Sequence, residues 1–174
     1  ICPVLDAEGK VVRLIGYGMD ITDRKRMELQ LAHMALHDAL TGLANRTLFL
    51  DRLRQALERT HRTGTRVAVL FVDLDRFKLI NDSLGHAAGD QLLVEASRRF
   101  QECLRSTDTL GRLAGDEFVV LAEVQDPTDP ARIAERLIEA LRPPFLLNGE
   151  EVYMTTSIGI AVGDWTRRPE DLLR

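Results

Sequence analysis

The sequence lacks several features that would place it in other classes of protein. No apolar run approaches the roughly 20 residues that cross a bilayer, and the N-terminus has no signal-peptide pattern. Two cysteines do not suggest a disulfide framework and fit a reducing cytosol. The formal net charge of -4 offers no general footprint for nucleic-acid binding. These absences favour a cytoplasmic domain with no nucleic-acid partner, although a parent protein could carry a membrane tether elsewhere.

A glycine-rich phosphate loop of the Walker type is also missing, so any triphosphate must be held in another way. The composition that remains is ordinary for a globular protein, with 45% hydrophobic and 29% charged residues. A length of 174 residues is enough for one domain with a core plus an appendage. Function must therefore be sought in motifs.

The first informative motif is a predicted β-hairpin with carboxylates at its tip. Residues 108–113 can form one strand, and residues 118–122 are a short, nearly continuous apolar run, as expected of a strand buried on both faces. Gly115 lies between them and suits a tight turn, because glycine reaches positive φ at no steric cost. The turn therefore displays Asp116 and Glu117 side by side.

A second acidic group follows the apolar run 66–72, which is typical of a buried strand and leads into residues 73–75. Carboxylates at the C-terminal end of a strand face the crevice where α/β sheets usually bind ligands. If the hairpin lies beside this strand, Asp73 can converge with Asp116 and Glu117. Such an all-oxygen cluster suits Mg²⁺. Either pair alone is better explained as a solvated turn.

The remaining elements are predicted from hydrophobic spacing, caps and turn residues. Helices are predicted over 48–62 and 90–104, in a short segment that ends at Gly85, and from Asp129 to before Pro143. The Asn148-Gly149 pair indicates a hairpin between residues 145–147 and a strand over 152–162.

Several segments, in one order and spacing, resemble those of the GGDEF-domain family, the diguanylate cyclases. The resemblance runs from about residue 38 to the C-terminus. It rests on residues 38–46 (DALTGLANR), 71–78 (FVDLDRFK), 80–82 (IND), 85–86 (GH), 89–90 (GD), 114–118 (AGDEF) and 157–161 (SIGIA). Their combination is far more specific than the acidic turn alone.

The resemblance implies an α/β (α+β) fold, like that of nucleotide cyclases and polymerase palms. Its central sheet would be mixed, mostly antiparallel and five-stranded, with helices flanking it. The implied activity is Mg²⁺- or Mn²⁺-dependent condensation of two GTP molecules to cyclic di-GMP and pyrophosphate. Each subunit resembles half of an active site, so catalysis would need a homodimer. The alternative is a catalytically weak domain that binds GTP or cyclic di-GMP and regulates an attached domain such as a phosphodiesterase.

The resemblance assigns the metal to Asp73, the main-chain carbonyl of Leu74, Asp116 and Glu117. The ion would neutralise developing phosphate charge and lower the pKa of the attacking hydroxyl. Asp116 or Glu117 would accept its proton, and the sequence does not choose between them. Ala114 replaces the first signature glycine. If that position needed positive φ, alanine would cost about 1 kcal/mol, which substrate binding should survive.

Substrate contacts are assigned to two further groups of residues. By resemblance, Asn81 and Asp90 recognise guanine; the structural alternatives are a turn residue and a helix N-cap. Arg76, Phe77 and Lys78 open a helix whose free N–H groups could bind phosphate, with Lys78 adding a positive charge. Without the resemblance, Lys78 would be an ordinary surface lysine.

Arg105 and Asp108 precede the turn at the spacing of the family's product-inhibition site. Arg105 could bind guanine or phosphate bidentately, and Asp108 could accept from a guanine edge. Arg112 could take part from a neighbouring subunit. Cyclic di-GMP would then be an inhibitor as well as a product. The structural alternative is a surface ion pair worth little.

Three parts are predicted along the chain. Residues 1–22 resemble the C-terminal end of a PAS sensor domain, and residues 23–37 form a helical signalling linker with an apolar seam at Met27, Leu31 and Met34. Residues 38–174 are predicted to form a GGDEF domain without the family's last, basic helix. The sequence does not decide whether this stretch is active by itself. The implied partners are an upstream PAS sensor, a second copy and, in the regulatory alternative, a phosphodiesterase domain.

Overall fold

The computed structural model describes residues 2–15, 20–23, 25 and 34–172, and the chain divides into two units, 1–33 and 34–174. The first unit contains an antiparallel hairpin of β1 (Cys2–Leu5) and β2 (Val11–Ile15). Asp6 holds its turn by accepting hydrogen bonds from the N–H groups of Glu8 and Lys10. Most of the predicted linker helix, including two of its three seam residues, falls outside the described residues.

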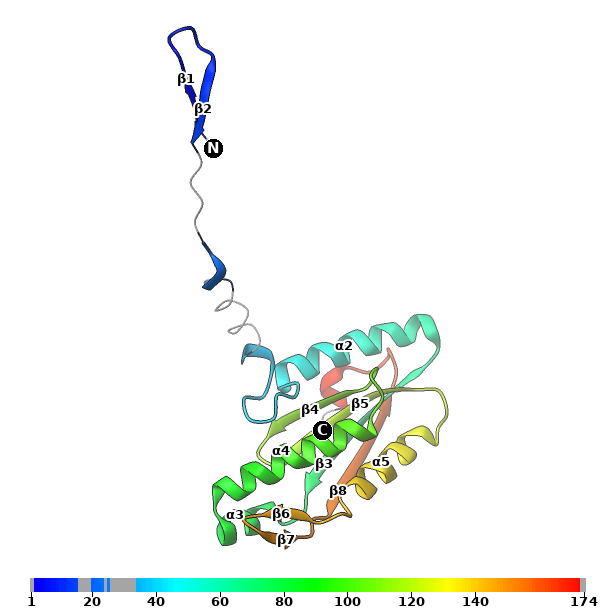
Figure 1. Cartoon of the computed structure of the whole chain (residues 1–174). Coiled ribbons are helices and arrows are strands. Elements are labelled where there is room, and N and C mark those ends of the chain that lie inside the picture. Colours follow the sequence, from blue (N-terminus) through cyan, green and yellow to red (C-terminus); the bar gives the residue numbers. More distant parts are fainter. Residues whose placement is uncertain (1, 16–19, 24, 26–33, 173–174) are drawn as a thin grey trace. The chain divides into compact units, whose positions relative to one another are not determined.

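The second unit carries the remaining elements (Figure 1). They are α2 (Arg46–Thr63), β3 (Arg66–Leu74), α3 (Phe77–Leu84), α4 (His86–Cys103), β4 (Thr109–Ala114), β5 (Glu117–Val124), α5 (Asp129–Ala140), β6 (Phe145–Leu147), β7 (Glu150–Val152), β8 (Thr156–Gly163) and the 3₁₀ turn η1 (Pro169–Asp171). In the described ranges, no helix has both the length and the apolar character needed to cross a bilayer.

The central sheet has the strand order β4-β5-β3-β8, and each neighbouring pair is antiparallel. The predicted α/β fold with a mostly antiparallel sheet and flanking helices is confirmed. The predicted mixed pairing and the fifth strand are not: the described sheet has four strands, all paired antiparallel, and β6 and β7 form a separate two-stranded sheet. The predicted strand 152–162 is divided, because β7 ends at Val152, the side chain of Met154 is buried, and β8 begins at Thr156.

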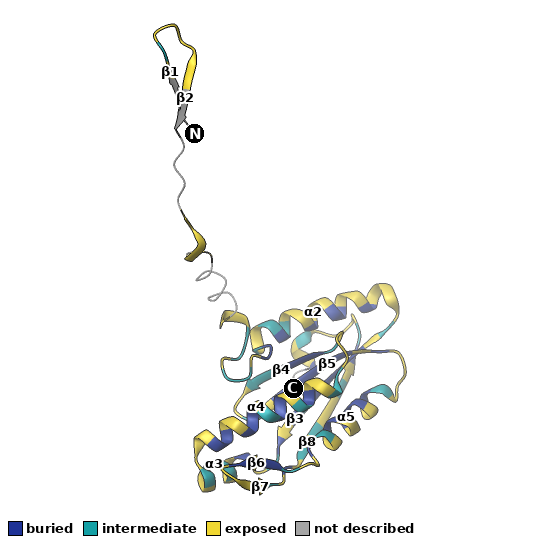
Figure 2. Ribbon diagram, viewed as in Figure 1, coloured by how far each residue is buried: buried dark blue, intermediate teal, exposed yellow. Residues whose placement is uncertain are grey.

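β3 is buried on both faces, which explains its continuous apolar sequence. Alternate side chains of a strand point to opposite faces. Val67 and Val69 pack with α2, whereas Ala68, Leu70 and Val72 belong to the larger core under α3, α4 and α5. In Figure 2 the helices turn their buried stripes towards the sheet and leave their outer faces exposed.

Local signals explain where several of the elements begin and end. The Asn45 side chain caps α2 by accepting from the Leu48 N–H, and Gly64 ends the helix in the left-handed conformation. Gly85 both ends α3 and precedes α4, so α4 begins at His86 rather than at residue 90. Asn148 and Gly149 have φ of 52° and 86°, as a hairpin turn between β6 and β7 requires.

Gly111 provides a test of how closely β4 packs against α2 and the segment before it. A Cβ at this position would lie 2.9 Å from the carbonyl oxygen of Ala44 and 3.2 Å from the Phe49 ring. Gly111→Ala should therefore lower the free energy of unfolding by about 1–3 kcal/mol, the usual cost of overpacking. Gly159→Ala is the matched control, because the nearest atom to its Cβ would be 3.9 Å away. Urea unfolding followed by circular dichroism measures both; equal stability of the two variants would contradict the packing.

Candidate functional site

The end of β3 lies beside the start of β5. In the antiparallel register Asp73 pairs with Glu117, and Asp116 occupies the turn between β4 and β5. Residues directly opposite each other on such a pair project from the same face, with Cβ atoms about 4.5–5.5 Å apart. The predicted convergence of Asp73 with the hairpin tip is therefore present. We call Asp73, Asp116 and Glu117 the carboxylate edge.

The carboxylates of this edge repel one another. Burial raises the pKa of Asp73, and the negative charges of Asp116, Glu117 and Asp75 raise it further. A cation would relieve this repulsion, and carboxylate oxygens are the donors that Mg²⁺ prefers. No three or more His, Cys, Asp or Glu side chains of the described residues are already grouped closely enough to hold an ion. The carboxylate donors of this edge are thus of the kind that Mg²⁺ binds. Coordination of the ion by Asp73, Asp116 and Glu117 stays a prediction.

The signature turn accommodates alanine without strain. Gly115 takes a positive φ of 49°, whereas Ala114 ends β4 and is not among the residues with positive φ. The penalty considered for alanine at this position therefore does not arise. The side chain of Leu74 is buried, so this residue can offer a ligand only its main chain.

Arg112 ties the turn to the start of the domain. Its Nε donates to the carbonyl oxygen of Gly115 at 2.8 Å, and its Nη1 donates to Oδ1 of Asp38 at 2.9 Å. The two charged side chains are only 11% and 23% exposed, so solvent screens them less than a surface pair. Burial acts to raise the pKa of Asp38, but hydrogen bonds from Thr41 and Arg112 outweigh it and lower that pKa.

The Asp38–Arg112 contact joins residues 74 positions apart, and sequence reasoning missed it because no local pattern links them. The contact also commits the guanidinium of Arg112 within its own chain. These contacts do not support the suggested role of Arg112 in binding cyclic di-GMP from a neighbouring subunit. That role stays a prediction.

Asn81 on α3 and Asp90 on α4 are brought together where the two helices meet. The Asn81 side chain lies over Gly89: a Cβ there would be 2.0 Å from Asn81 Oδ1. Both residues lie inside helices, so the alternatives of a turn residue and an N-cap are wrong. Gly89 therefore lies between the two residues predicted to contact guanine, and its missing side chain leaves room for the Asn81 amide. The sequence analysis did not identify this role of Gly89.

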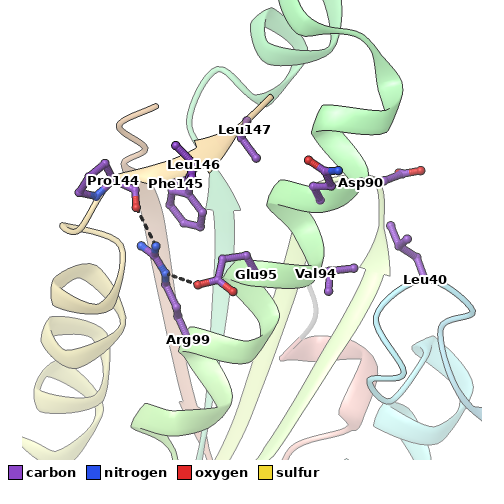
Figure 3. A pocket seen from close by; sticks show the side chains of 10 residues that line it. Leu40, Asp90, Val94, Glu95, Arg99, Pro144, Phe145, Leu146 and Leu147 are labelled. Carbon is purple, nitrogen blue, oxygen red and sulfur yellow. Dashed lines mark hydrogen bonds and ion pairs between the residues drawn. The ribbon is translucent and has the colours of Figure 1, made fainter. Parts of the chain in front are cut away.

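A cavity of about 610 Å³ opens next to Asp90 (Figure 3). Its lining is mainly apolar and comes from α4, β6 and the segment before α2: Leu40, Asp90, Gln91, Val94, Glu95, Arg99, Pro144, Phe145, Leu146 and Leu147. Arg99 closes one wall, lying 3.9 Å from the centre of the Phe145 ring and donating to the Pro144 carbonyl at 2.8 Å. Hydrogen bonds from Arg98 and Arg99 lower the pKa of Glu95 to about 2, despite its burial. The cavity thus presents apolar surface beside a carboxylate.

The predicted phosphate contacts lie at the start of α3. Arg76 precedes the helix in the left-handed conformation, with φ 61°, and both Arg76 and Lys78 are exposed. Phe77 is 9% exposed and belongs to the core. Its side chain is therefore committed to packing, and any phosphate contact from Phe77 would come from its N–H.

Arg105 and Asp108 close a tight loop just before β4. The Asp108 carboxylate accepts from the Arg105 N–H at 3.0 Å, and the Asp108 N–H donates to the Arg105 carbonyl at 3.0 Å. These contacts involve the Arg105 main chain, so its exposed guanidinium is not committed by them. β4 has 6 residues, which places the loop roughly 20 Å from the turn at ~3.3 Å per residue.

Comparison with known proteins covers most of the chain. Residues 35–174 match the family model described as "Diguanylate cyclase, GGDEF domain". The chain is 46% identical over 151 residues to the bifunctional diguanylate cyclase/cyclic di-GMP phosphodiesterase MucR of Pseudomonas aeruginosa, covering 86% of this chain and 22% of MucR. It is 47% identical over 134 residues to diguanylate cyclase TpbB of the same species, covering 76% of this chain and 31% of TpbB. The chain thus spans less than a third of these relatives.

Solved structures of GGDEF domains are also similar to this chain. The GGDEF domain of TpbB from Pseudomonas aeruginosa superposes with a TM-score of 0.74 at 44% identity, over 79% of this chain and 81% of that one. A sensory box/GGDEF family protein from Caulobacter crescentus gives 0.75 at 41% identity, over 79% and 90%.

Gly89 offers a test of the Asn81 placement. In Gly89→Ala the new methyl group should displace the Asn81 amide, and affinity for GTP should fall about tenfold, the cost of one lost hydrogen bond of about 1.4 kcal/mol. Alanine is the better helix former, so weaker binding would not reflect a weaker helix. Calorimetry on Gly89→Ala and on Asn81→Ala measures both; the placement is wrong if only the second variant loses affinity.

Proposed function

The chain belongs to the GGDEF-domain family of diguanylate cyclases, and on that basis we propose that it condenses two GTP molecules to cyclic di-GMP and releases pyrophosphate. The observation that carries the proposal is the register that sets Asp73 opposite Glu117, with Asp116 beside them. Similarity to diguanylate cyclase TpbB supports it. The chain spans less than a third of the length of these relatives. The cyclase activity of the whole protein is therefore proposed here as well.

The carboxylate edge would hold Mg²⁺ or Mn²⁺ through Asp73, Asp116, Glu117 and the main-chain carbonyl of Leu74. When bound, the ion supplies positive charge that offsets phosphate charge and lowers the pKa of the attacking hydroxyl. In the reaction, the 3′-hydroxyl of one GTP attacks the α-phosphorus of the other and pyrophosphate leaves; a second attack of the same kind closes the ring and releases a second pyrophosphate. Asp116 or Glu117 accepts the hydroxyl proton.

The substrate is proposed to lie along α3. The Asp90 carboxylate accepts from the N1–H and N2–H₂ groups of guanine, and the Asn81 amide binds its O6 or N7 acceptors. The phosphates bind N–H groups at the start of α3, with charge from Lys78 and Arg76. Each chain supplies one half of the site, so the active species is a homodimer.

The regulatory alternative, a catalytically weak GTP- or cyclic-di-GMP-binding module, is not favoured. All three carboxylates are present, and Ala114 imposes no backbone strain. The similarity to MucR, whose name includes a phosphodiesterase activity, supports an attached phosphodiesterase domain as a partner of the cyclase. We further propose that residues 1–22 end a PAS sensor, that 23–37 link it to the cyclase, and that the reaction occurs in the cytoplasm.

We also propose that cyclic di-GMP binds at Arg105 and Asp108 as an inhibitor, with Arg112 as a further candidate. The exposed Arg105 side chain, on a loop shaped by Asp108, supports this assignment. The distance from the carboxylate edge means that bound product could not touch the metal and would have to act on domain arrangement.

Asp73→Asn tests the metal site. The variant removes the charge of one metal ligand, so Mg²⁺-dependent GTP affinity should fall at least about tenfold, and cyclic di-GMP formation should be lost with it. Asp51→Asn on the exposed face of α2 is the control. Calorimetry measures binding, and chromatography of a GTP and Mg²⁺ incubation identifies the product. Unchanged GTP binding by a folded Asp73→Asn protein would falsify the metal assignment.

Arg105→Ala tests the product site. Affinity for cyclic di-GMP should fall at least about tenfold because a charge-assisted contact is lost, whereas GTP affinity should change less than about twofold. Titration of both ligands into wild type and variant measures this. Parallel loss of both affinities would show that the two residues only support the fold.

A further inference from the structure

Asp75 is the second carboxylate after β3, and the proposed metal site does not use it. Both of its oxygens are occupied: the Thr155 hydroxyl donates to Oδ2 at 2.5 Å, and the Ser157 hydroxyl donates to Oδ1 at 2.7 Å. The Asp75 N–H also donates to the Thr155 carbonyl at 3.0 Å. Three hydrogen bonds therefore join the residue after β3 to the start of β8. We call this set of contacts the Asp75 latch.

The latch lies next to the carboxylate edge. β3 pairs with β5 on one side and with β8 on the other, and Asp73 is opposite Glu117 in the first pair and Ser157 in the second. These three residues form one row and project from the same face of the sheet. The serine hydroxyl of this row is directed at Asp75, and the hydroxyl of the preceding residue, Thr156, donates to the main-chain carbonyl of Asp73 at 2.6 Å.

The backbone turns sharply directly after the latch. Arg76 has φ 61° and ψ 23°, a left-handed conformation that is unfavourable for a residue with a Cβ. Such a conformation persists only where the surroundings hold it. The latch lies one residue before Arg76, and α3 begins one residue after it. The direction of α3 therefore depends on the conformation of Arg76, which directly follows the latch.

We infer that Asp75 is a positioning residue: together with Thr155 and Ser157 it fixes the Arg76 turn and so holds the first-turn N–H groups of α3 where GTP phosphates meet the carboxylate edge. This inference rests on the proposed function. Asp75 does not touch the substrate or the metal in this account. Each of its oxygens keeps a second lone pair beside its hydroxyl partner, so a role as a metal ligand is the alternative to be tested.

Two substitutions at Asp75 separate positioning from metal binding. Asparagine has the same shape, accepts through Oδ1 and can donate through Nδ2 to a hydroxyl oxygen, so Asp75→Asn keeps the latch and loses only the charge. Asp75→Ala loses both contacts. The Kd for GTP with Mg²⁺ should rise about tenfold in Asp75→Ala and stay within about threefold of wild type in Asp75→Asn. Equal losses in the two variants would overturn the inference in favour of a charge or ligand role.

The hydroxyl partners complete the test. Thr155→Val combined with Ser157→Ala should raise the Kd as much as Asp75→Ala, and adding Asp75→Ala to this pair should change little, because one latch is removed in each case. Thr166→Val is the matched control: its hydroxyl binds Asp164 in the loop after β8, and its loss should leave the Kd unchanged. Full additivity of Asp75→Ala with the partner substitutions would contradict the latch.

A measurement without nucleotide separates this inference from the proposed function. Hydrogen exchange at the Asp75 and Leu79 amides, which donate to the carbonyls of Thr155 and Arg76, should accelerate in Asp75→Ala and remain at the wild-type rate in Asp75→Asn, while exchange in β5 is unchanged. Unaltered exchange in Asp75→Ala would refute the latch even if the enzyme is active. Failure of wild type to bind GTP would instead refute the proposed function, and the exchange result would still decide the latch.

Discussion

The register of β3 between β5 and β8 is the constraint on which the site depends. It sets Asp73 opposite Glu117 on one side and opposite Ser157 on the other. A slip of one residue would turn Asp73 to the opposite face of the sheet. The core prevents this slip, because Val69 packs with α2 while Leu70 packs with α4 and α5, and a slip would exchange the two faces. The same apolar alternation that stabilises the sheet therefore aligns the carboxylates.

Polar contacts over long sequence separations then shape the loops around this edge. Arg112 links the signature turn to Asp38, and Asp75 links the turn before α3 to Thr155 and Ser157. Hydrogen bonds to charged groups contribute about 1.5–3 kcal/mol each, most where water is excluded. The Asp38–Arg112 pair is largely buried, so it should stabilise the turn more than the exposed contacts of Asp75 stabilise theirs.

The sequence predicted features that local chemistry decides. Gly115 adopts the positive φ expected of it, and the Asn148-Gly149 hairpin is present. The meeting of Asp73 with the hairpin tip is a tertiary contact, and the two carboxylate pairs taken together predicted it. Other features were missed. The start of α4 before residue 90 was missed although Gly85 marks it locally, and the division of the strand predicted over 152–162 near the buried Met154 depends on tertiary packing. Neither the close packing of Asn81 on Gly89 nor the Asp75 latch leaves a local signal, since each depends on how separate elements meet.

If metal and GTP phosphates meet at the carboxylate edge, paramagnetic broadening by Mn²⁺ should show it most directly. Once the backbone amides are assigned, Mn²⁺ added at a small fraction of the protein concentration, with a non-reactive GTP analogue, should broaden the amides of residues 73–75 and 115–117 first. The loop of Arg105 and Asp108, roughly 20 Å away along β4, should stay sharp. Broadening centred on that loop, or spread evenly over exposed carboxylates, would contradict the account.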